Sequence, residues 1–268
     1  MTRGIPILLY HRIGRLDGTF MDRYTVTPER FAAQMGTLRD GGWEVCELRS
    51  LLSDASPRGQ RRRTRRVAIT FDDGFAENRE HAWPVLKRLG FPSSTFVVAG
   101  RVGGMNEWDG PGRSSYPLLT RSEICTAPAS LSAIFPHSMT HADLTLYQRP
   151  ELLRDDLRES RAQLEAVIDA KSDILAYPRG SWSFAVIAAA KELGYVAGCT
   201  CMEGRNTSRT NPFLLRRVEI HDRDVGWRLT LKLRFGRDLL RWPPRRPASL
   251  AIAARWLRFA RTRPAAGR

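Results

Sequence analysis

Residues 67–74 read VAITFDDG, and this stretch decides the fold. The run from Val67 to Phe71 is apolar and rich in β-branched residues, which predicts a buried strand. Two adjacent carboxylates, Asp72 and Asp73, follow at once, and a glycine comes next. Asp and Gly are common turn residues, so one interpretation is a plain turn. Neighbouring like charges repel, so the other interpretation is that the pair has a chemical task.

Apolar runs like this one recur along the chain and alternate with amphipathic segments. Strands are predicted at 5–10, 43–48, 67–71, 94–100, 131–135, 174–178, 195–200 and 215–220. Helices are predicted at 27–40, 77–90, 150–170 and 183–193, with a short one opening at 120–123. Such alternation is typical of a parallel sheet with helices outside it. The number of units favours a closed (β/α) barrel over an open sheet.

The alternation stops near residue 230. We therefore expect a barrel domain over residues 1–230 and a basic, partly helical tail over 231–268. WPPRRP at 242–247 is a linker-like break, and 248–263 has the composition of a basic helix. Such a helix either packs on the barrel or lies on an anionic membrane surface.

The charge of the chain is local. The net charge is +15, yet residues 58–66 alone carry six arginines and no acid, and residues 221–268 carry 13 Lys or Arg against three Asp. Basic patches of this kind bind phosphates, anionic lipid or nucleic acid, or remain solvated. No nucleic-acid recognition motif accompanies the charge, so we expect no specific nucleic-acid partner.

The location of the protein is predicted from what the sequence lacks. The four cysteines show no pairing pattern, which favours a reducing compartment. The first apolar run, 5–10, is too short for a signal-peptide core or a membrane span. We therefore predict a cytoplasmic protein, membrane-peripheral if the basic tail contacts lipid.

Polar residues cluster where predicted strands end, which is where parallel α/β folds build their sites. HSMTH at 137–141 places His137 and His141 four residues apart after one strand. Two histidines plus one carboxylate suit a catalytic divalent metal, although an isolated pair on a polar loop is also common. Tyr177 follows a further strand, and Trp108 lies in the long loop 100–118.

The motifs TFDDG, HSMTH and AYPRG, in this order, resemble those of the polysaccharide deacetylases with the NodB homology domain, carbohydrate esterase family 4. ILLYHRIG, VTPERF and LKRLGFPSSTFVV make the chain similar to the branch of exopolysaccharide and poly-N-acetylglucosamine deacetylases. The resemblance covers residues from about 5 to 220. It implies a distorted (β/α) barrel of about seven parallel strands.

The resemblance also implies a role for each motif residue. Asp72 corresponds to the general base, and Asp73, His137 and His141 to the ligands of one divalent metal. Zinc is expected, with cobalt, nickel or iron as alternatives. A water polarised by the metal and deprotonated by Asp72 would attack an acetamide carbonyl.

Four further residues are assigned to substrate contact and proton transfer. The Arg179 backbone N–H is the candidate oxyanion donor, and Tyr177 and Trp108 are candidate substrate contacts. The resemblance implies a general acid from a late motif, and His221 is the candidate because it is the only histidine late in the chain.

The chain departs from the family pattern in three places. Ala176 stands where many members have an arginine, Arg179 stands where the branch usually has an aromatic residue, and Phe135-Pro136 precede His137 instead of small or polar residues. The implied function is a metal-dependent hydrolase that removes an N-acetyl group from an amino sugar in a polysaccharide, oligosaccharide or glycolipid precursor. The alternative is a catalytically impaired barrel that acts as a glycan- or membrane-binding partner.

Overall fold

The computed structural model describes residues 4–53, 65–110, 114–127 and 131–240. Most of the basic segment 58–66 and the expected helix at 248–263 lie outside these residues. All the extended strand pairs of the described residues are parallel.

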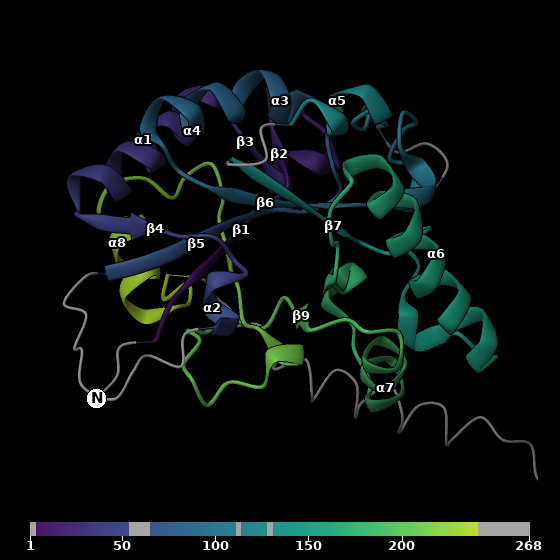
Figure 1. Cartoon of the computed structure of the whole chain (residues 1–268). Coiled ribbons are helices and arrows are strands. Elements are labelled where there is room, and N and C mark those ends of the chain that lie inside the picture. The colour runs from purple at the N-terminus through teal and green to yellow at the C-terminus, as the bar shows by residue number, and fades with distance from the viewer. Residues whose placement is uncertain (1–3, 54–64, 111–113, 128–130, 241–268) are drawn as a thin grey trace, which may run out of the picture.

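The main sheet runs in the order β10-β1-β5-β6-β7, and β4 pairs with the start of β5 (Figure 1). Its strands are β1 (Ile7–Tyr10), β4 (Trp43–Val45), β5 (Arg65–Phe71), β6 (Ser93–Val97), β7 (Ser132–Pro136) and β10 (Val218–Glu219). Two short pairs stand beside it: β2 (Arg12–Ile13) with β3 (Thr25–Val26), and β8 (Ile174–Ala176) with β9 (Ala197–Cys199).

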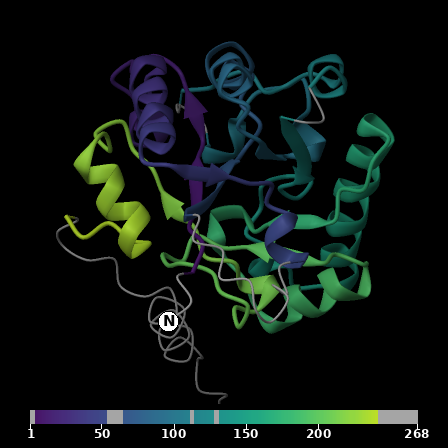
Figure 2. The same ribbon diagram turned by 60° about the vertical axis from the view of Figure 1, so that its left-hand side comes forward.

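The helices lie outside the sheet, and α8 packs against α1 (Figures 1 and 2). They are α1 (Pro28–Asp40), α2 (Ser50–Ser53), α3 (Glu77–His81), α4 (Trp83–Leu89), α5 (Arg121–Cys125), α6 (Pro150–Ile168), α7 (Phe184–Glu192) and α8 (Trp227–Phe235). Six 3₁₀ turns connect them: η1 (Phe20–Tyr24), η2 (Ala99–Arg101), η3 (Glu107–Asp109), η4 (Leu144–Leu146), η5 (Pro178–Gly180) and η6 (Pro212–Leu214).

Local chemistry explains several boundaries. The segment 77–90 forms two helices, because Pro84 occupies the first turn of α4 and a proline fits there but not in a helix interior. Gly90 ends α4 in the left-handed conformation. Thr120 and Glu123 form the capping box expected from TRSE. The helix α8 was not expected from the sequence.

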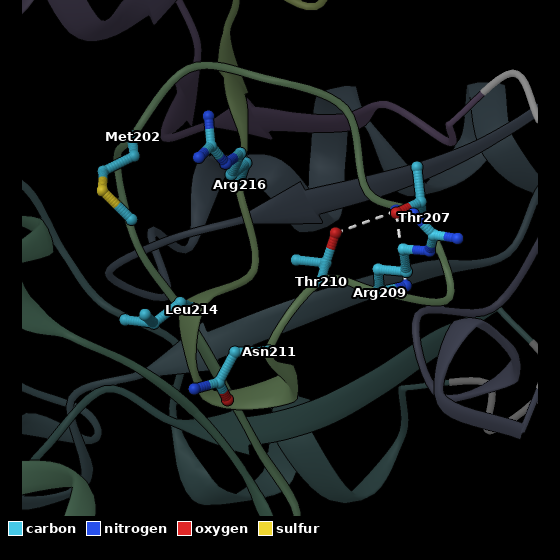
Figure 3. Close-up of a pocket in the computed structure, with 7 residues that line it drawn as sticks. All are labelled: Met202, Thr207, Arg209, Thr210, Asn211, Leu214 and Arg216. Atoms are coloured by element: carbon cyan, nitrogen blue, oxygen red, sulfur yellow. Dashed lines mark hydrogen bonds between the residues drawn. The ribbon is translucent and has the colours of Figure 1, made fainter.

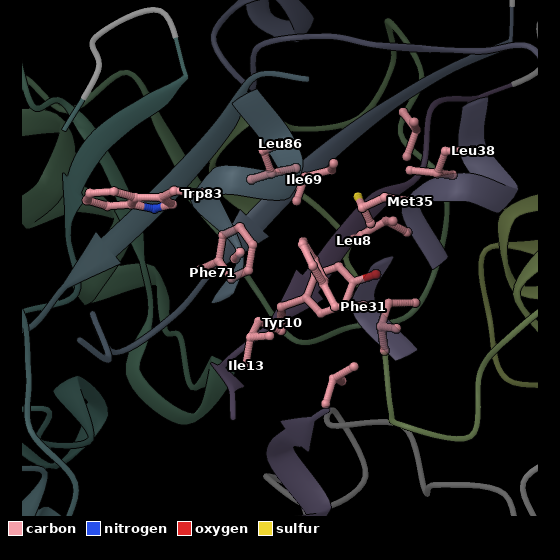
Figure 4. Packing of buried hydrophobic residues seen from close by; sticks show 14 of the residues in the cluster. Leu8, Tyr10, Ile13, Phe31, Met35, Leu38, Ile69, Phe71, Trp83 and Leu86 are labelled. Atoms are coloured by element: carbon pink, nitrogen blue, oxygen red, sulfur yellow. The ribbon is translucent and has the colours of Figure 1, made fainter. Parts of the chain in front are cut away.

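Successive side chains of each strand point to opposite faces of the sheet, so the strands contribute residues to two hydrophobic clusters. Leu8, Tyr10 and Phe71 face the helices and pack against Phe31 and Met35 of α1 (Figure 4). The opposite faces of β1, β5, β6, β7, β8 and β9 share a second cluster, which includes Ile7, Ala68, Phe96, Phe135, Ile174 and Ala197. The strands therefore curve around a common interior.

The parallel α/β fold is confirmed, whereas full closure of the barrel stays a prediction. Among the described residues, β7 and β8 are joined by side-chain bonds: Ser172 Oγ donates to the Ile134 carbonyl at 2.9 Å. On the other side, an isolated bridge links Cys199 to Leu215, just before β10. The division at residue 230 also stays a prediction; Leu229 and Leu233 of α8 belong to the helix-facing cluster.

Candidate active site

The register of β1 and β5 places His11 and Asp72 side by side. Tyr10 lies opposite Phe71, and the Asp72 backbone N–H donates to the Tyr10 carbonyl at 2.9 Å. Because Tyr10 and Phe71 face the helices, the residues that follow them are expected to face the interior. His11 interacts electrostatically with both aspartates. The sequence analysis did not assign His11 to the site.

Asp73 and Gly74 turn the chain away from the strand. Both have positive φ, 73° and 80°. A left-handed aspartate is unusual, and such strained positions cluster at functional sites. A Cβ on Gly74 would lie 3.3 Å from the Val97 side chain, so a glycine fits this turn best. The turn lets the two adjacent carboxylates point in different directions.

The histidine loop, residues 137–141, is fixed at both ends. The His137 backbone N–H donates to Val97 O at 2.8 Å, and its Nδ1 lies 2.8 Å from Ala176 O. A carbonyl at Nδ1 requires a proton there, which leaves Nε2 as the free lone pair. His141 has φ 62°, and its N–H donates to Ser138 Oγ at 2.9 Å. Phe135-Pro136 continue β7 and do not displace His137.

Asp73, His137 and His141 converge on one point. Asp73 Oδ1 lies 3.4 Å from Nε2 of each histidine, and one ligand atom from each residue lies within 4.8 Å of the others. All three side chains are buried, and in the described part of the chain Asp73 Oδ1 has no hydrogen bond of good geometry. An orphaned carboxylate oxygen that faces the Nε2 atoms of two histidines fits a divalent metal such as zinc.

Asp72 is held by a residue that the sequence analysis missed. Arg217 makes two bonds to its carboxylate, Nη1 to Oδ1 at 2.6 Å and Nη2 to Oδ2 at 2.7 Å. The Arg217 side chain is fully buried, and its Nε donates to Thr200 O at 3.0 Å. Arg217 thus supplies the guanidinium that is absent at Ala176. In the sequence, Arg217 could have been noticed because it is an arginine inside the strand predicted at 215–220, which was expected to be buried.

The pKa shifts follow from this arrangement. Burial would raise the pKa of Asp72, but the Arg217 guanidinium, with His137 and His11, lowers it. Burial would likewise raise the pKa of Asp73, and the two facing histidines hold it well below its usual value. Burial would lower the pKa of His137, and Asp72 and Asp73 raise it. Both carboxylates are therefore ionised at neutral pH.

Two of the expected substrate residues lie beside the cluster. The Trp108 ring lies on His141 with a centroid distance of 4.5 Å. Arg179 has φ 58°, interacts electrostatically with His141, and lies 3.9 Å from Asp109. Its side chain is half exposed. Trp108 and Arg179 are therefore both neighbours of His141.

The family model for polysaccharide deacetylase matches residues 59–198, which is more than half of the chain. The chain belongs to the polysaccharide deacetylase family. The matched region includes Asp72, Asp73, His137, His141 and Arg179, but neither His11 nor Arg217. As a family member, the protein is an amidohydrolase.

Two curated relatives agree with this assignment. The polysaccharide deacetylase YxkH of Bacillus subtilis (strain 168) is 25% identical over 220 residues, which cover 81% of this chain and 71% of that protein. The poly-beta-1,6-N-acetyl-D-glucosamine N-deacetylase of Staphylococcus aureus (strain MRSA252) is 23% identical over 207 residues, 74% of this chain and 69% of that protein.

Solved structures support the fold of the deacetylase. The Streptococcus pyogenes deacetylase PplD, determined in complex with acetate, superposes with a TM-score of 0.73 at 21% identity and covers 86% of this chain and 98% of its own. IcaB from Ammonifex degensii gives a TM-score of 0.73 at 24% identity and covers 87% of this chain and 97% of its own. At these identities the likeness shows the fold alone.

The deacetylase places two predicted site residues elsewhere. The Tyr177 ring is fully buried in a hydrophobic cluster with Leu175 and Val186, and its hydroxyl donates to Phe213 O at 3.0 Å. His221 Nδ1 lies 3.0 Å from Arg23 O, and its Nε2 lies 3.8 Å from Glu219. None of these contacts joins Tyr177 or His221 to the Asp73–His137–His141 cluster, so their roles stay predictions.

Two surface hollows of the deacetylase are separate from the cluster. One of about 270 Å³ is lined by Met202, Thr207, Arg209, Thr210, Asn211, Leu214 and Arg216 (Figure 3). A larger one of about 610 Å³ shares Thr207 and Thr210 with it and also includes Arg49 and Leu51. Their linings contain none of Asp73, His137 and His141, so neither hollow includes the cluster.

Proposed function

We propose that the protein is a metal-dependent deacetylase that removes the N-acetyl group from an amino sugar in a polysaccharide, oligosaccharide or glycolipid precursor. One observation carries the proposal. Asp72, ionised and clamped by Arg217, lies 4.0 Å from His137 Nε2, beside the Asp73–His137–His141 cluster. A base fixed next to a three-residue ligand set is the arrangement that amide hydrolysis by an activated water requires.

Asp73, His137 and His141 would hold the metal. When bound there, a divalent cation would polarise water and the amide carbonyl, as zinc does in hydrolases. The cation would also offset the repulsion between the two neighbouring carboxylates. Zinc fits the N₂O donor set, and cobalt, nickel and iron are the alternatives.

Asp72 takes the proton of the attacking water. Its lowered pKa keeps it in the ionised form that a general base needs. The Arg217 pair holds both carboxylate oxygens in place, so the base does not have to be oriented during the reaction. The Arg179 backbone N–H remains the candidate donor to the oxyanion, because its left-handed turn follows Pro178 directly.

His11 is the better-placed proton donor to the leaving amine. It follows β1 at the level of Asp72 and interacts electrostatically with both aspartates. His221 remains a second candidate, although its ring is tied to Arg23 O and Glu219. A donor must come within hydrogen-bond reach of the group it protonates, which favours the histidine nearer the base.

The predicted contact with an anionic membrane is also part of the proposal. No described helix is long and apolar enough to cross a membrane. On α8, however, Trp227 and Phe235 are exposed, and Arg228 and Arg234 lie over their rings. Exposed aromatic residues with arginines suit the interface of an anionic bilayer. The cytoplasmic location stays a prediction.

The test is acetate release from N-acetylated sugars. Purified protein with added Zn²⁺ or Co²⁺ is incubated with N-acetylglucosamine oligomers of β-1,6 and β-1,4 linkage, and free acetate is measured. We expect release by the wild type, loss on chelation and recovery on metal return. Asp72→Asn should lower the rate by a factor of about 10² or more, because it removes the base.

The matched control is Asp40→Asn, at an exposed aspartate that pairs with Arg39 on α1. It should leave the rate unchanged. Wild-type activity that survives in Asp72→Asn would contradict the assigned mechanism.

A further inference from the structure

The histidine loop has a backbone conformation that its residues do not favour intrinsically. Ser138 and His141 both have positive φ, 68° and 62°. Residues with a Cβ avoid this region, so the surrounding contacts must hold the loop in it. The shape matters because it turns the two imidazoles toward Asp73.

One side of the loop is held by the chain after β6. The Ala99 N–H donates to Ser138 O and the Gly100 N–H to Met139 O, both at 3.0 Å. A Cβ on Gly100 would meet Met139 O at 2.5 Å, so only glycine permits this approach. These bonds hold the carbonyl groups of Ser138 and Met139. The Met139 N–H still needs an acceptor, which must come from another part of the fold.

The other side of the loop is held by Asp156, which is buried on α6. Its Oδ1 accepts the Met139 N–H at 3.0 Å, and its Oδ2 accepts the Tyr147 hydroxyl at 2.7 Å. The Asp156 side chain is therefore bonded both to the centre of the loop and to the chain that leaves it. Burial raises the pKa of Asp156 above its usual value.

The helix that carries Asp156 is long and packed against the core. It is 19 residues long, and Leu153, Leu157 and Leu164 are buried along it. A side chain on a packed helix holds its partners more accurately than one on a loop.

We propose that Asp156 is a positioning residue for the metal centre: by accepting the Met139 N–H it fixes the 137–141 loop in the shape that points His137 and His141 at Asp73. This inference rests on the proposed function. Asp156 does not touch the metal or the substrate. It sets the metal affinity through the two histidines, as outer hydrogen-bond partners do in metal sites.

The test is the affinity of purified full-length variants for Co²⁺ and Zn²⁺, measured by competition with a chelator. Asp156→Ala leaves the Met139 N–H without an acceptor and should weaken binding by a factor of about 10–100. Asp156→Asn should restore binding to within about threefold, because the amide oxygen still accepts that N–H. The control is Asp155→Ala, since Asp155 is half exposed and pairs with Arg158 on the same helix.

Two outcomes separate positioning from simple packing. A purely structural Asp156 would lower the melting temperature of the metal-free protein in Asp156→Ala and leave the metal affinity unchanged; that result overturns the proposal. If Asp156→Ala does not fold, Tyr147→Phe replaces it, with an expected loss of about threefold in affinity. Wild-type affinity in Tyr147→Phe would then overturn the proposal.

Failure of the inference differs from failure of the proposed function. If the wild type binds metal and releases acetate while Asp156→Ala binds metal equally well, the positioning role is wrong and the deacetylase function stands. If the wild type binds no metal at all, the metal-dependent function is wrong and the positioning role fails with it.

Discussion

Replacing Arg217 with methionine should destabilise the protein more than any ordinary arginine substitution. Arg217 is fully buried, and the substitution leaves the Asp72 carboxylate without the two bonds of 2.6 and 2.7 Å. Breaking a buried ion pair by removing one partner costs about 3–5 kcal/mol, because the remaining charge is uncompensated. We therefore expect Arg217→Met to lower the free energy of unfolding at neutral pH by about that amount.

The assay is denaturant unfolding at several pH values, with Arg216→Met as the matched control. Arg216 is the exposed neighbour and bonds only weakly, to Glu203 O at 3.4 Å. In the wild type the pKa of Asp72 is lower in the folded protein than in the unfolded chain. The ionised carboxylate therefore stabilises the fold at pH values above the pKa of the unfolded aspartate, and this stabilisation is lost as the pH falls through the folded-state pKa. In Arg217→Met burial raises the pKa of Asp72, so the deficit should be largest at neutral pH and shrink below about pH 4.

A double-mutant cycle identifies the cause of the loss. In an Asp72→Asn background no charge is left to compensate, so Arg217→Met should cost less than half of what it costs in the wild type. Two results would refute the reasoning. One is that Arg217→Met lowers the free energy of unfolding no more than Arg216→Met does; the other is that Arg217→Met costs the same with and without the Asp72 carboxylate.

Three further outcomes are expected. His11→Ala should lower kcat by a factor of about 10² or more, and His221→Ala by less than about tenfold, in acetate-release assays; the reverse order would restore His221 as the acid. Trp108→Ala should lower kcat/KM about tenfold while the protein keeps its metal, because the ring that covers His141 is lost; unchanged kinetics would exclude a substrate contact. Binding to vesicles of anionic phospholipid should weaken in Trp227→Ala and be absent with neutral vesicles; equal binding to both kinds would contradict an electrostatic contact.

Much of the fold could be predicted because its signals are local. The run before Asp72 is apolar and β-branched, and the structure has β5 there. Thr27 and Pro28 mark the start of α1, and Pro84 marks the start of α4. The helix α8 escaped prediction, because its alternating apolar and basic residues, WRLTLKLRF, do not follow the helical period clearly.

The Asp73–His137–His141 cluster could be predicted for the same reason, since all three residues follow strands; that it holds a metal stays a prediction. Arg217 could not, because its partner lies 145 residues earlier and only the pairing of β10 with β1, and of β1 with β5, brings the two together. His11 was expected to support the end of the barrel and was not assigned to the site, because a single histidine after a strand gives no spacing signal. The register of the parallel strands places both Arg217 and His11 near Asp72, and this register could not be predicted from the sequence.

The central claim is that Asp73, His137 and His141 hold one divalent metal. Metal content by elemental analysis, on wild type and His137→Ala purified side by side, tests it most directly. The control is His81→Ala, at a histidine on α3 away from the cluster. We expect close to one metal per chain in the wild type and in His81→Ala, and almost none in His137→Ala. No metal in the wild type after incubation with Zn²⁺ or Co²⁺, or equal metal in His137→Ala, would contradict the claim.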